Sequence, residues 1–480
     1  STLPMQQYLT AFPIPGKADL PEHISFSDFR FLQIGGTAAD AELKTRNSAH
    51  GTDTKSRVLF YCKKCNIYVE YNAVNVFYRF STFIKNATFA TFAAICALLF
   101  SCASSPDKQK TADSVPEGLT VLEATGEQSV QTLTLAFAGD IMAHKHNVRG
   151  NFSEIYKDIE PLLKKSDLAF VNLETAVDDS KEYSSYPNFN VKHAYPDAAI
   201  SAGFNVFSLA NNHTNDYGLD GMRATKKYFE KQSALYADSE RKVYSAGIKD
   251  SKNAPLTFAL IDAAGWKVLY CAVTEVLNRN DFSSYIDYVR PSEKQRRLFL
   301  EELKMLRQKN ECDLFVLSLH TAEEEYVPGV SDRQKKFYTD ILNAGVDIIN
   351  ANHPHIAKEW NVYADENGTA RKIVFFSQGN TISGQRREPD FSNPSCSRDY
   401  TGDAFITNVV VSKDSRGIVI EQVDPVLITT YITPSWHFVI KVLDDEFIEE
   451  LKLKKQKTWA NYLGERKKLM EKIKGNIIWQ

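Results

Sequence analysis

Short apolar runs rich in β-branched and aromatic residues alternate with helical segments from Thr132 onward, and this alternation limits the fold most. Most of these runs lack the regularly spaced polar residues of a half-solvated strand, which predicts strands buried on both faces. Buried strands separated by helices are typical of α/β proteins with parallel or mixed sheets. The predicted strands are Leu133–Ala138, Leu168–Asn172, Val206–Ala210, Thr257–Asp262, Lys267–Val273, Leu314–Leu319, Val346–Ile349 and Ile373–Phe376.

Helices are predicted between these strands, and a hairpin and a helix after them. The hairpin joins Ala404–Val411 to Gly417–Pro425, and the Lys- and Glu-rich residues 441–480 predict a charged helix that packs on the domain or binds a partner. Ser331 is expected to cap its helix, and Gly345 to follow its end. The predicted helices are Phe152–Lys165, Pro196–Gly203, Leu219–Ser233, Glu293–Lys309 and Ser331–Asn343.

The residues before the domain have the pattern of an export signal. Arg79 and Lys85 precede the apolar run Ala87–Phe100, which is followed by Ser101 and Cys102. A charged segment, a short apolar segment and a small-residue junction indicate a secretory signal, and the run is short for a membrane span of ~20 residues. Residues 77–102 therefore predict a signal peptide with a lipobox, in which Cys102 is lipidated. An ordinary cleaved signal and an uncleaved anchor are the alternatives.

This signal sets the expected layout of the chain. Residues 1–76 precede it, so we expect them to be a non-native upstream extension with little structure. Residues 103–131 are polar, with two prolines, which is the composition of a flexible tether. The chain is thus expected to be exported to the cell envelope and anchored to the membrane through lipid.

Composition excludes some classes of protein. Lys and Arg number 57 against 60 Asp and Glu, a formal net charge of −3, so nucleic acid is not expected as a partner. Seven cysteines in 480 residues are too few for a disulfide scaffold. Two basic pairs, Lys192-His193 and Arg386-Arg387, are candidates for binding an anionic polymer or phosphate, although such short runs usually belong to a solvated face.

Side chains that can bind metal follow five of the predicted strands. Ligand sites of α/β folds lie at the carboxyl ends of strands, so we expect these side chains to converge. One of them alone would more simply cap a turn or hold a structural hydrogen bond, but five together predict a metal site. They are Asp140, Glu174, Asn212 with its neighbours Asn211 and His213, His320, and His353 with His355.

The residue types suit two transition-metal ions. The carboxylates of Asp140 and Glu174 can bridge cations, and imidazoles with an amide oxygen complete a mixed sphere that fits Mn, Fe, Zn or Co. Two such ions ~3.5–4 Å apart clamp the attacking and leaving oxygens of a phosphoryl transfer. His213 would face the substrate as general acid or electrostatic stabiliser.

The motifs also occur in a characteristic order, which resembles that of the bacterial capsule-synthesis CapA family. The similarity spans roughly Thr132–Gln385. It implies a calcineurin-like metallophosphoesterase fold, a four-layer α/β sandwich of mixed sheets flanked by helices, over residues 132–440. The motifs are GDIM (Gly139–Met142), NLE (Asn172–Glu174), LANNHTNDYG (Leu209–Gly218), His320 with Glu325-Tyr326, HPH (His353–His355) and SQGN (Ser377–Asn380).

The resemblance implies roles for individual residues. It implies up to two divalent ions, with His213 as the catalytic-type histidine and with Asn211, Glu325 and Asn380 contacting substrate or supporting the ligands. The segment His320–Tyr326 reads HTAEEEY where the family has HWGxEY, so Glu324 competes with Glu325 for the family glutamate. One metal would lie near Asp140, Glu174 and His355, and the other near Glu174, Asn212, His320 and His353.

Three functions follow as hypotheses. The first is a capsule-polymer protein of the envelope that acts in poly-γ-glutamate synthesis or export together with a membrane synthase. The second is a metal-dependent phosphoesterase that acts on an envelope phosphate ester. The third, weaker hypothesis is a surface binding protein without catalysis.

Overall fold

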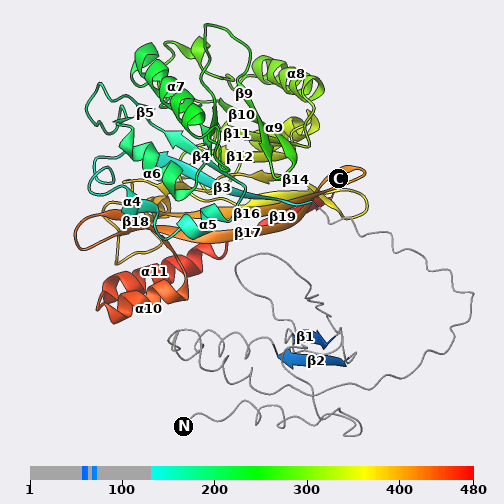
Figure 1. Cartoon of the computed structure of the whole chain (residues 1–480). Coiled ribbons are helices and arrows are strands. Elements are labelled where there is room, and N and C mark those ends of the chain that lie inside the picture. Colours follow the sequence, from blue (N-terminus) through cyan, green and yellow to red (C-terminus); the bar gives the residue numbers. More distant parts are fainter. Residues whose placement is uncertain (1–56, 63–66, 73–130, 480) are drawn as a thin grey trace, which may run out of the picture. The chain divides into compact units, whose positions relative to one another are not determined.

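The computed structural model describes residues 57–62, 67–72 and 131–479 (Figure 1). The predicted signal peptide, Cys102 and nearly all of the predicted tether lie outside the described residues. Within residues 1–76, where little structure was expected, β1 (Arg57–Cys62) and β2 (Ile67–Asn72) pair antiparallel, with Arg57 opposite Asn72. The remaining elements belong to a separate unit, which is described next.

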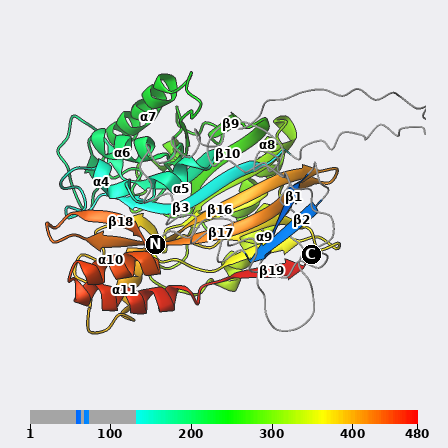
Figure 2. The same cartoon turned by 60° about the horizontal axis from the view of Figure 1, so that its bottom comes forward.

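Two mixed sheets form the centre of this unit. The first, here the β3 sheet, has the order β18-β17-β16-β3-β4-β7-β8, with β15 (Asn380–Ile382) pairing with β3. Neighbours among β3, β4, β7 and β8 are parallel, and β16, β17 and β18 add antiparallel strands (Figure 2). Its other strands are β3 (Leu133–Met142), β4 (Leu168–Glu174), β7 (Val206–Ser208), β8 (Tyr244–Ala246), β16 (Asp403–Asp414), β17 (Gly417–Ile432) and β18 (Phe438–Val442).

The second sheet, here the β11 sheet, has the order β19-β13-β14-β12-β11-β10-β9. Its centre, from β10 through β11 and β12 to β14, is parallel, and β9 and β13 pair antiparallel with their inner neighbours. The strands are β9 (Phe258–Ala263), β10 (Trp266–Thr274), β11 (Leu314–His320), β12 (Ile348–Asn352), β13 (Trp360–Ala364), β14 (Ala370–Phe375) and β19 (Gly475–Trp479). A further short pair joins β5 (Ala176–Val177) to β6 (Asn190–Val191).

The two sheets pack face to face. Successive side chains along a strand point to opposite faces, so each strand contributes to two apolar clusters. On β11, Leu314 and Val316 belong to the apolar cluster between the sheets, whereas Phe315 and Leu317 belong to the cluster on the opposite face. The ring of Phe137 on β3 lies 5.3 Å from that of Phe375 on β14, which joins the two sheets directly. Strands buried on both faces were predicted from their continuous apolar runs, and this prediction is confirmed except for Thr257–Asp262, which forms the largely exposed edge strand β9.

Helices cover the outer faces, which gives a mixed α/β structure of two sheets flanked by helices. Phe229 of α7 packs on Phe207 of the β3 sheet with ring centroids 5.0 Å apart. On the β11 sheet, Leu303 and Ile341 pack into the outer cluster. The β3 sheet carries α4 (Ser153–Tyr156), α5 (Glu160–Lys164), α6 (Ala194–Ala202) and α7 (Gly218–Leu235), and the β11 sheet carries α8 (Glu293–Lys309) and α9 (Asp332–Asn343).

Helix ends follow their capping residues. The Ser331 side chain accepts a hydrogen bond from the Gln334 backbone N–H at the start of α9, and Gly345 has φ +107° just after its end, as predicted.

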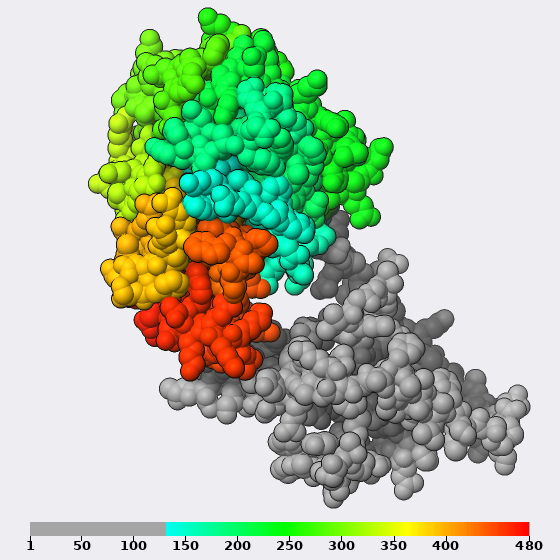
Figure 3. All heavy atoms as spheres, turned by 90° about the vertical axis from the view of Figure 1, so that its left-hand side faces the viewer, coloured from blue at the N-terminus to red at the C-terminus, as the bar shows by residue number. Residues whose placement is uncertain are grey.

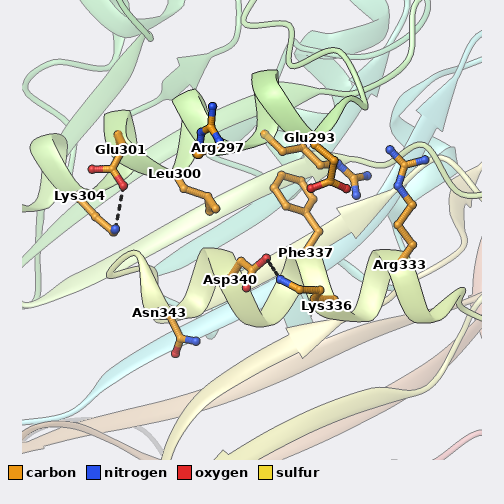
Figure 4. A pocket seen from close by; sticks show the side chains of 11 residues that line it. Glu293, Arg297, Leu300, Glu301, Lys304, Arg333, Lys336, Phe337, Asp340 and Asn343 are labelled. Atoms are coloured by element: carbon orange, nitrogen blue, oxygen red, sulfur yellow. Dashed lines mark hydrogen bonds and ion pairs between the residues drawn. The ribbon is translucent and has the colours of Figure 1, made fainter.

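A groove of about 380 Å³ lies between α8 and α9 (Figure 4). Two of its lysines are paired within their own helices, Lys304 with Glu301 at 2.8 Å and Lys336 with Asp340 at 2.7 Å.

The C-terminal residues differ from the single charged helix that was predicted. The helices α10 (Asp445–Leu453) and α11 (Lys457–Met470) are separated at Lys455, whose φ of +60° no helix accommodates, and β19 follows them. Both helices pack through Leu451 and Leu463 on an apolar cluster that includes Tyr431 of β17. In Figure 3 these helices, in red, lie against the orange segment. The predicted hairpin is confirmed as β16 and β17.

No helix in the described part of the chain combines the length and the apolar character needed to cross a membrane.

Candidate metal centre

The predicted ligands lie where parallel strands of both sheets end. Asp140 is near the end of β3 and pairs with Asn172, while Glu174 ends β4. His320 ends β11, and β12 ends at Asn352, directly before the HPH motif. Because the carboxyl ends of parallel strands share one edge, the two sheets bring these side chains to a common place.

A close approach of two backbone segments shapes the start of the site. The Asp140 backbone N–H donates to the Gly379 carbonyl at 3.1 Å. A Cβ atom at position 139 would lie 1.8 Å from that same oxygen, far inside contact distance, so only glycine fits before Asp140. The glycine of the GDIM motif is thus a packing requirement that brings the SQGN segment to β3.

The innermost group consists of Asp140, Glu174 and His320, which are all buried. One ligand atom from each lies within 4.8 Å of the others. Asn172, between them, donates through Nδ2 to Asp140 Oδ1 at 2.8 Å and lies 3.4 Å from His320 Nδ1. Since an amide N–H faces His320 Nδ1, this nitrogen acts as an acceptor, and Nε2–H donates to Asn212 Oδ1 at 2.8 Å.

The HPH motif adds two further imidazoles. His353 and His355 have φ of +99° and +58°, the left-handed region that non-glycine residues rarely occupy, and such strain concentrates at functional sites. His355 Nδ1 lies between two acceptors, Asp140 Oδ2 at 3.3 Å and Asn380 Oδ1 at 3.1 Å. Its Nδ1 therefore carries the proton, and the lone pair of Nε2 lies 3.8 Å from Glu174 Oε1.

A second group of possible ligands contains Glu325, His353 and His355, again with ligand atoms within 4.8 Å. Glu325 Oε1 is 4.0 Å from His353 Nε2, whereas Glu324 is exposed to solvent. Of the two glutamates left open by the sequence, Glu325 thus lies at the cluster.

His213 lies beside the carboxylates on the loop after β7. Its Nδ1 is 2.7 Å from Asp216 Oδ2, and its Nε2 is 3.9 Å from Glu174 Oε1. The Asp216 carboxylate accepts the Nδ1 proton, so Nε2 faces the cluster as the nitrogen that can exchange a proton there. Asn211 supports this loop, since its Nδ2 donates to the Leu173 carbonyl at 2.9 Å and its Oδ1 accepts the His213 N–H at 3.1 Å.

The electrostatics of the site fit a cation. Burial, followed by the nearby Asp140, Glu325 and Asp216 charges, raises the pKa of Glu174 well above its ordinary value. Burial, followed by neighbouring histidines, lowers the pKa of His320, and burial and His355 lower that of His353 to about 4, so both rings are neutral at pH 7. Glu174 Oε1 is buried and has no hydrogen-bond partner among the described residues. A divalent ion would satisfy this oxygen and relieve the repulsion of the carboxylates.

The structure brings together every predicted ligand within the described chain, together with His213, Asn211, Glu325 and Asn380. Two groups of ligand atoms result, in which His320 joins Asp140 and Glu174, and His355 joins Glu325 and His353. His355 Nδ1 also lies 3.3 Å from Asp140 Oδ2, so the two groups are adjacent.

Two contributors were missed as site residues. Asn172, noted only within its NLE motif, links Asp140 to His320, and Asp216 orients His213. Asp216 was likewise noted only within its motif, LANNHTNDYG (Leu209–Gly218).

The loop that carries Glu325 is held by a buried lysine. Lys358, 4% exposed, donates through Nζ to the Gly329 carbonyl at 2.8 Å and lies 3.8 Å from Glu323 Oε2. Burial, against the opposing attraction of Glu323, lowers the pKa of Lys358 to about 8. The charged form of this amine is therefore less stable in the folded chain than in the unfolded chain.

This lowered pKa predicts that the difference in unfolding free energy between wild type and Lys358→Met depends on pH. From about pH 8 up to the unfolded pKa of ~10.4, the unfolded wild type holds more protons, so its stability rises with pH relative to the variant. We expect the gap in unfolding free energy, wild type minus variant, to increase by about 1–3 kcal/mol between pH 7 and pH 10 in urea titrations. A constant or shrinking gap would contradict this assignment.

Comparison with known proteins places the same region in a family. The profile of the family described as bacterial capsule synthesis protein PGA_cap matches residues 134–385, more than half of the chain. This match contains all the candidate ligands.

Individual relatives have matching names. The chain is 28% identical over 272 residues to the capsule biosynthesis protein CapA of Bacillus anthracis, covering 53% of this chain and 61% of that protein. It is 26% identical over 271 residues to the PGA biosynthesis protein CapA of Bacillus subtilis (strain 168), covering 54% of this chain and 65% of the relative. The chain thus spans less than two thirds of the length of either relative.

Proposed function

Since the chain belongs to the bacterial capsule synthesis protein PGA_cap family, whose fold is metallophosphoesterase-like, we propose that it acts in the synthesis or export of a poly-γ-glutamate-type capsule polymer at the cell envelope. The proposal includes a centre for up to two divalent transition-metal ions, of the Mn, Fe or Zn type. It also includes attachment to the membrane through lipid on Cys102 and cooperation with a membrane-bound polymer synthase. The names of the two relatives support the polymer.

One observation carries the metal centre. Glu174 Oε1 is buried, without a hydrogen-bond partner in the described chain, and it faces both His213 Nε2 at 3.9 Å and His355 Nε2 at 3.8 Å. An oxygen in this state is costly unless a cation occupies the space that it faces. Asp140, Glu174, Asn212, His320, His353 and His355 would hold the ions.

The protein's own groups then define the chemistry. Bound ions would polarise an anionic oxygen of the substrate and supply an activated water. His213, held by Asp216, presents Nε2 to the same space and can hold or deliver a proton at a leaving oxygen. Phe189 packs on His213 with ring centroids 4.6 Å apart, which restricts the imidazole to this orientation.

The histidine–aspartate pair also favours a second candidate, a metal-dependent phosphoesterase acting on an envelope phosphate ester. A protein that only binds polymer has no need of a proton-transfer group beside a carboxylate and imidazole cluster. Hydrolysis of bis(p-nitrophenyl) phosphate by the purified chain, lost with chelator and restored by Mn²⁺, would support this candidate.

The polymer role is tested in the source cells. Deletion of the gene should lower the surface content of acid-hydrolysable anionic polymer, and complementation with wild type should restore it. Complementation with the His353→Ala/His355→Ala double variant should fail if the metal centre is needed. Unchanged polymer after deletion would overturn the proposed role, and full rescue by the double variant would favour a non-catalytic binding protein.

A further inference from the structure

A loop beside the metal ligands connects the centre to the molecular surface. Asn380, which accepts from His355, donates through Nδ2 to Gln385 Oε1 at 2.8 Å. Gln385 Nε2 in turn donates to the Tyr326 hydroxyl at 3.2 Å. The Tyr326 ring lies 6.0 Å from the His355 ring and is 41% exposed, so Gln385 stands at the boundary between the buried ligands and solvent.

An arginine without an acidic partner is fixed to this loop. Arg398, in η3 (Ser397–Gly402), is exposed, and its Nε donates to the Gln385 carbonyl at 3.0 Å. Within the described chain, no carboxylate forms an ion pair with its guanidinium. One hydrogen bond therefore anchors the side chain, and both terminal nitrogens remain available to a ligand.

The basic residues that the sequence proposed for an anion are already paired. Arg386, proposed from sequence for an anion, is buried and pairs with Asp403 at 2.7 Å, and Arg387 pairs with Glu388 at 3.4 Å. Lys192 likewise pairs with Glu182 at 3.1 Å. Arg398 thus differs from these residues in having its charge uncompensated.

His144, which follows β3, contacts the same loop and adds a hydrogen-bond donor beside it. His144 Nδ1 accepts the Gly384 backbone N–H at 3.3 Å, so the proton of the neutral ring is on Nε2. The His144 ring lies 5.0 Å from Phe189, whose ring contacts His213 at 4.6 Å. His144 and His213 therefore contact the same phenyl ring, which links the loop to the histidine of the candidate centre.

We propose that Arg398, with Tyr326 and His144, binds a negatively charged group of the substrate beside the metal centre and so determines specificity for an anionic substrate. The inference rests on the proposed function for the centre itself. A guanidinium recognises carboxylate and phosphate through the same paired N–H donors, so the shared chemistry is a planar or tetrahedral oxyanion. A γ-linked glutamate chain offers planar carboxylates, and a phosphate ester offers a tetrahedral phosphate.

The test measures binding of two probes by isothermal titration to the full chain, with and without added Mn²⁺. The probes are a γ-linked glutamate tetramer and inorganic phosphate. Arg398→Ala should weaken binding of the preferred probe at least about tenfold, because it removes charge-assisted hydrogen bonds. Arg398→Lys should restore part of this loss, since the charge returns without the paired geometry.

Arg297→Ala is the matched control. Arg297 lies on α8 at the groove in Figure 4 and, among the described residues, also has no ion pair, so its loss changes the net charge equally. Its variant should bind both probes as wild type does. The tighter probe identifies carboxylate or phosphate as the recognised group.

Two results would overturn the inference: equal binding by Arg398→Ala and wild type, or no binding of either probe to wild type. Metal content measured on the same samples separates the two proposals. A metal-loaded chain that binds both probes independently of Arg398 leaves the metal centre intact and rejects only the role of Arg398. A metal-free chain whose binding depends on Arg398 rejects the centre and retains the anion site.

Discussion

Alanine at both His353 and His355 should remove transition metal from the purified full-length chain, as measured by inductively coupled plasma mass spectrometry. Wild type is expected to hold about two equivalents if both ions bind. The double variant deletes two imidazoles of the cluster, and that of His355 lies 3.3 Å from Asp140 and 3.8 Å from Glu174. The ligands that remain, Asp140, Glu174, Asn212 and His320, leave the coordination sphere of two ions incomplete.

His437→Ala is the control for this experiment, since His437 is an exposed histidine on the turn before β18. It should retain the wild-type metal content, and all three proteins should have the same far-ultraviolet circular dichroism. Stoichiometric metal in the double variant would show that the HPH motif does not supply ligands. The strain at both φ angles would then need another explanation.

The sequence predicted the parts of the fold that local patterns determine. Runs such as Leu314–Leu319 are apolar on both faces, and only a strand between two layers buries both. Strands defined by pairing with distant residues were missed. β15 is three residues long and exists because Asn380 pairs with Asp140, and β19 is exposed along its length and depends on β13.

The candidate site was predictable to the extent that strand ends determine it. Asp140, Glu174 and His320 lie at or near the carboxyl ends of parallel strands, so topology brings them to one region. The supporting residues depend on loop conformation, which no local pattern encodes. Gln385 reaches Tyr326 across 59 positions of sequence, and the partner of Arg386 lies 17 residues away at Asp403.

Asp403 is the centre of a buried ion network next to the site. Its Oδ1 accepts from Arg386 at 2.7 Å and its Oδ2 from Arg466 of α11 at 2.6 Å, and all three side chains are at most 1% exposed. Arg386 directly follows Gln385, and the Thr401 carbonyl, two residues before Asp403, accepts from Asn380 at 2.9 Å. The network therefore fastens α11 and the loop of the proposed anion site to the β3 sheet.

Asp403→Ala should lower the free energy of unfolding by about 3–5 kcal/mol in urea titrations, because two buried guanidinium groups lose their counter-charge. Asp403→Asn keeps a hydrogen-bond acceptor but no charge, so its free energy of unfolding should lie between those of Asp403→Ala and wild type. Asp414→Ala is the matched control: it also removes both bonds to an arginine, Arg371, at 2.8 and 2.7 Å, but its side chain is 37% exposed, so solvent screens the pair and the loss should be far smaller than at Asp403. Equal losses at the two positions would mean that burial of the network adds nothing, and that α11 is held to the sheet by its apolar contacts alone.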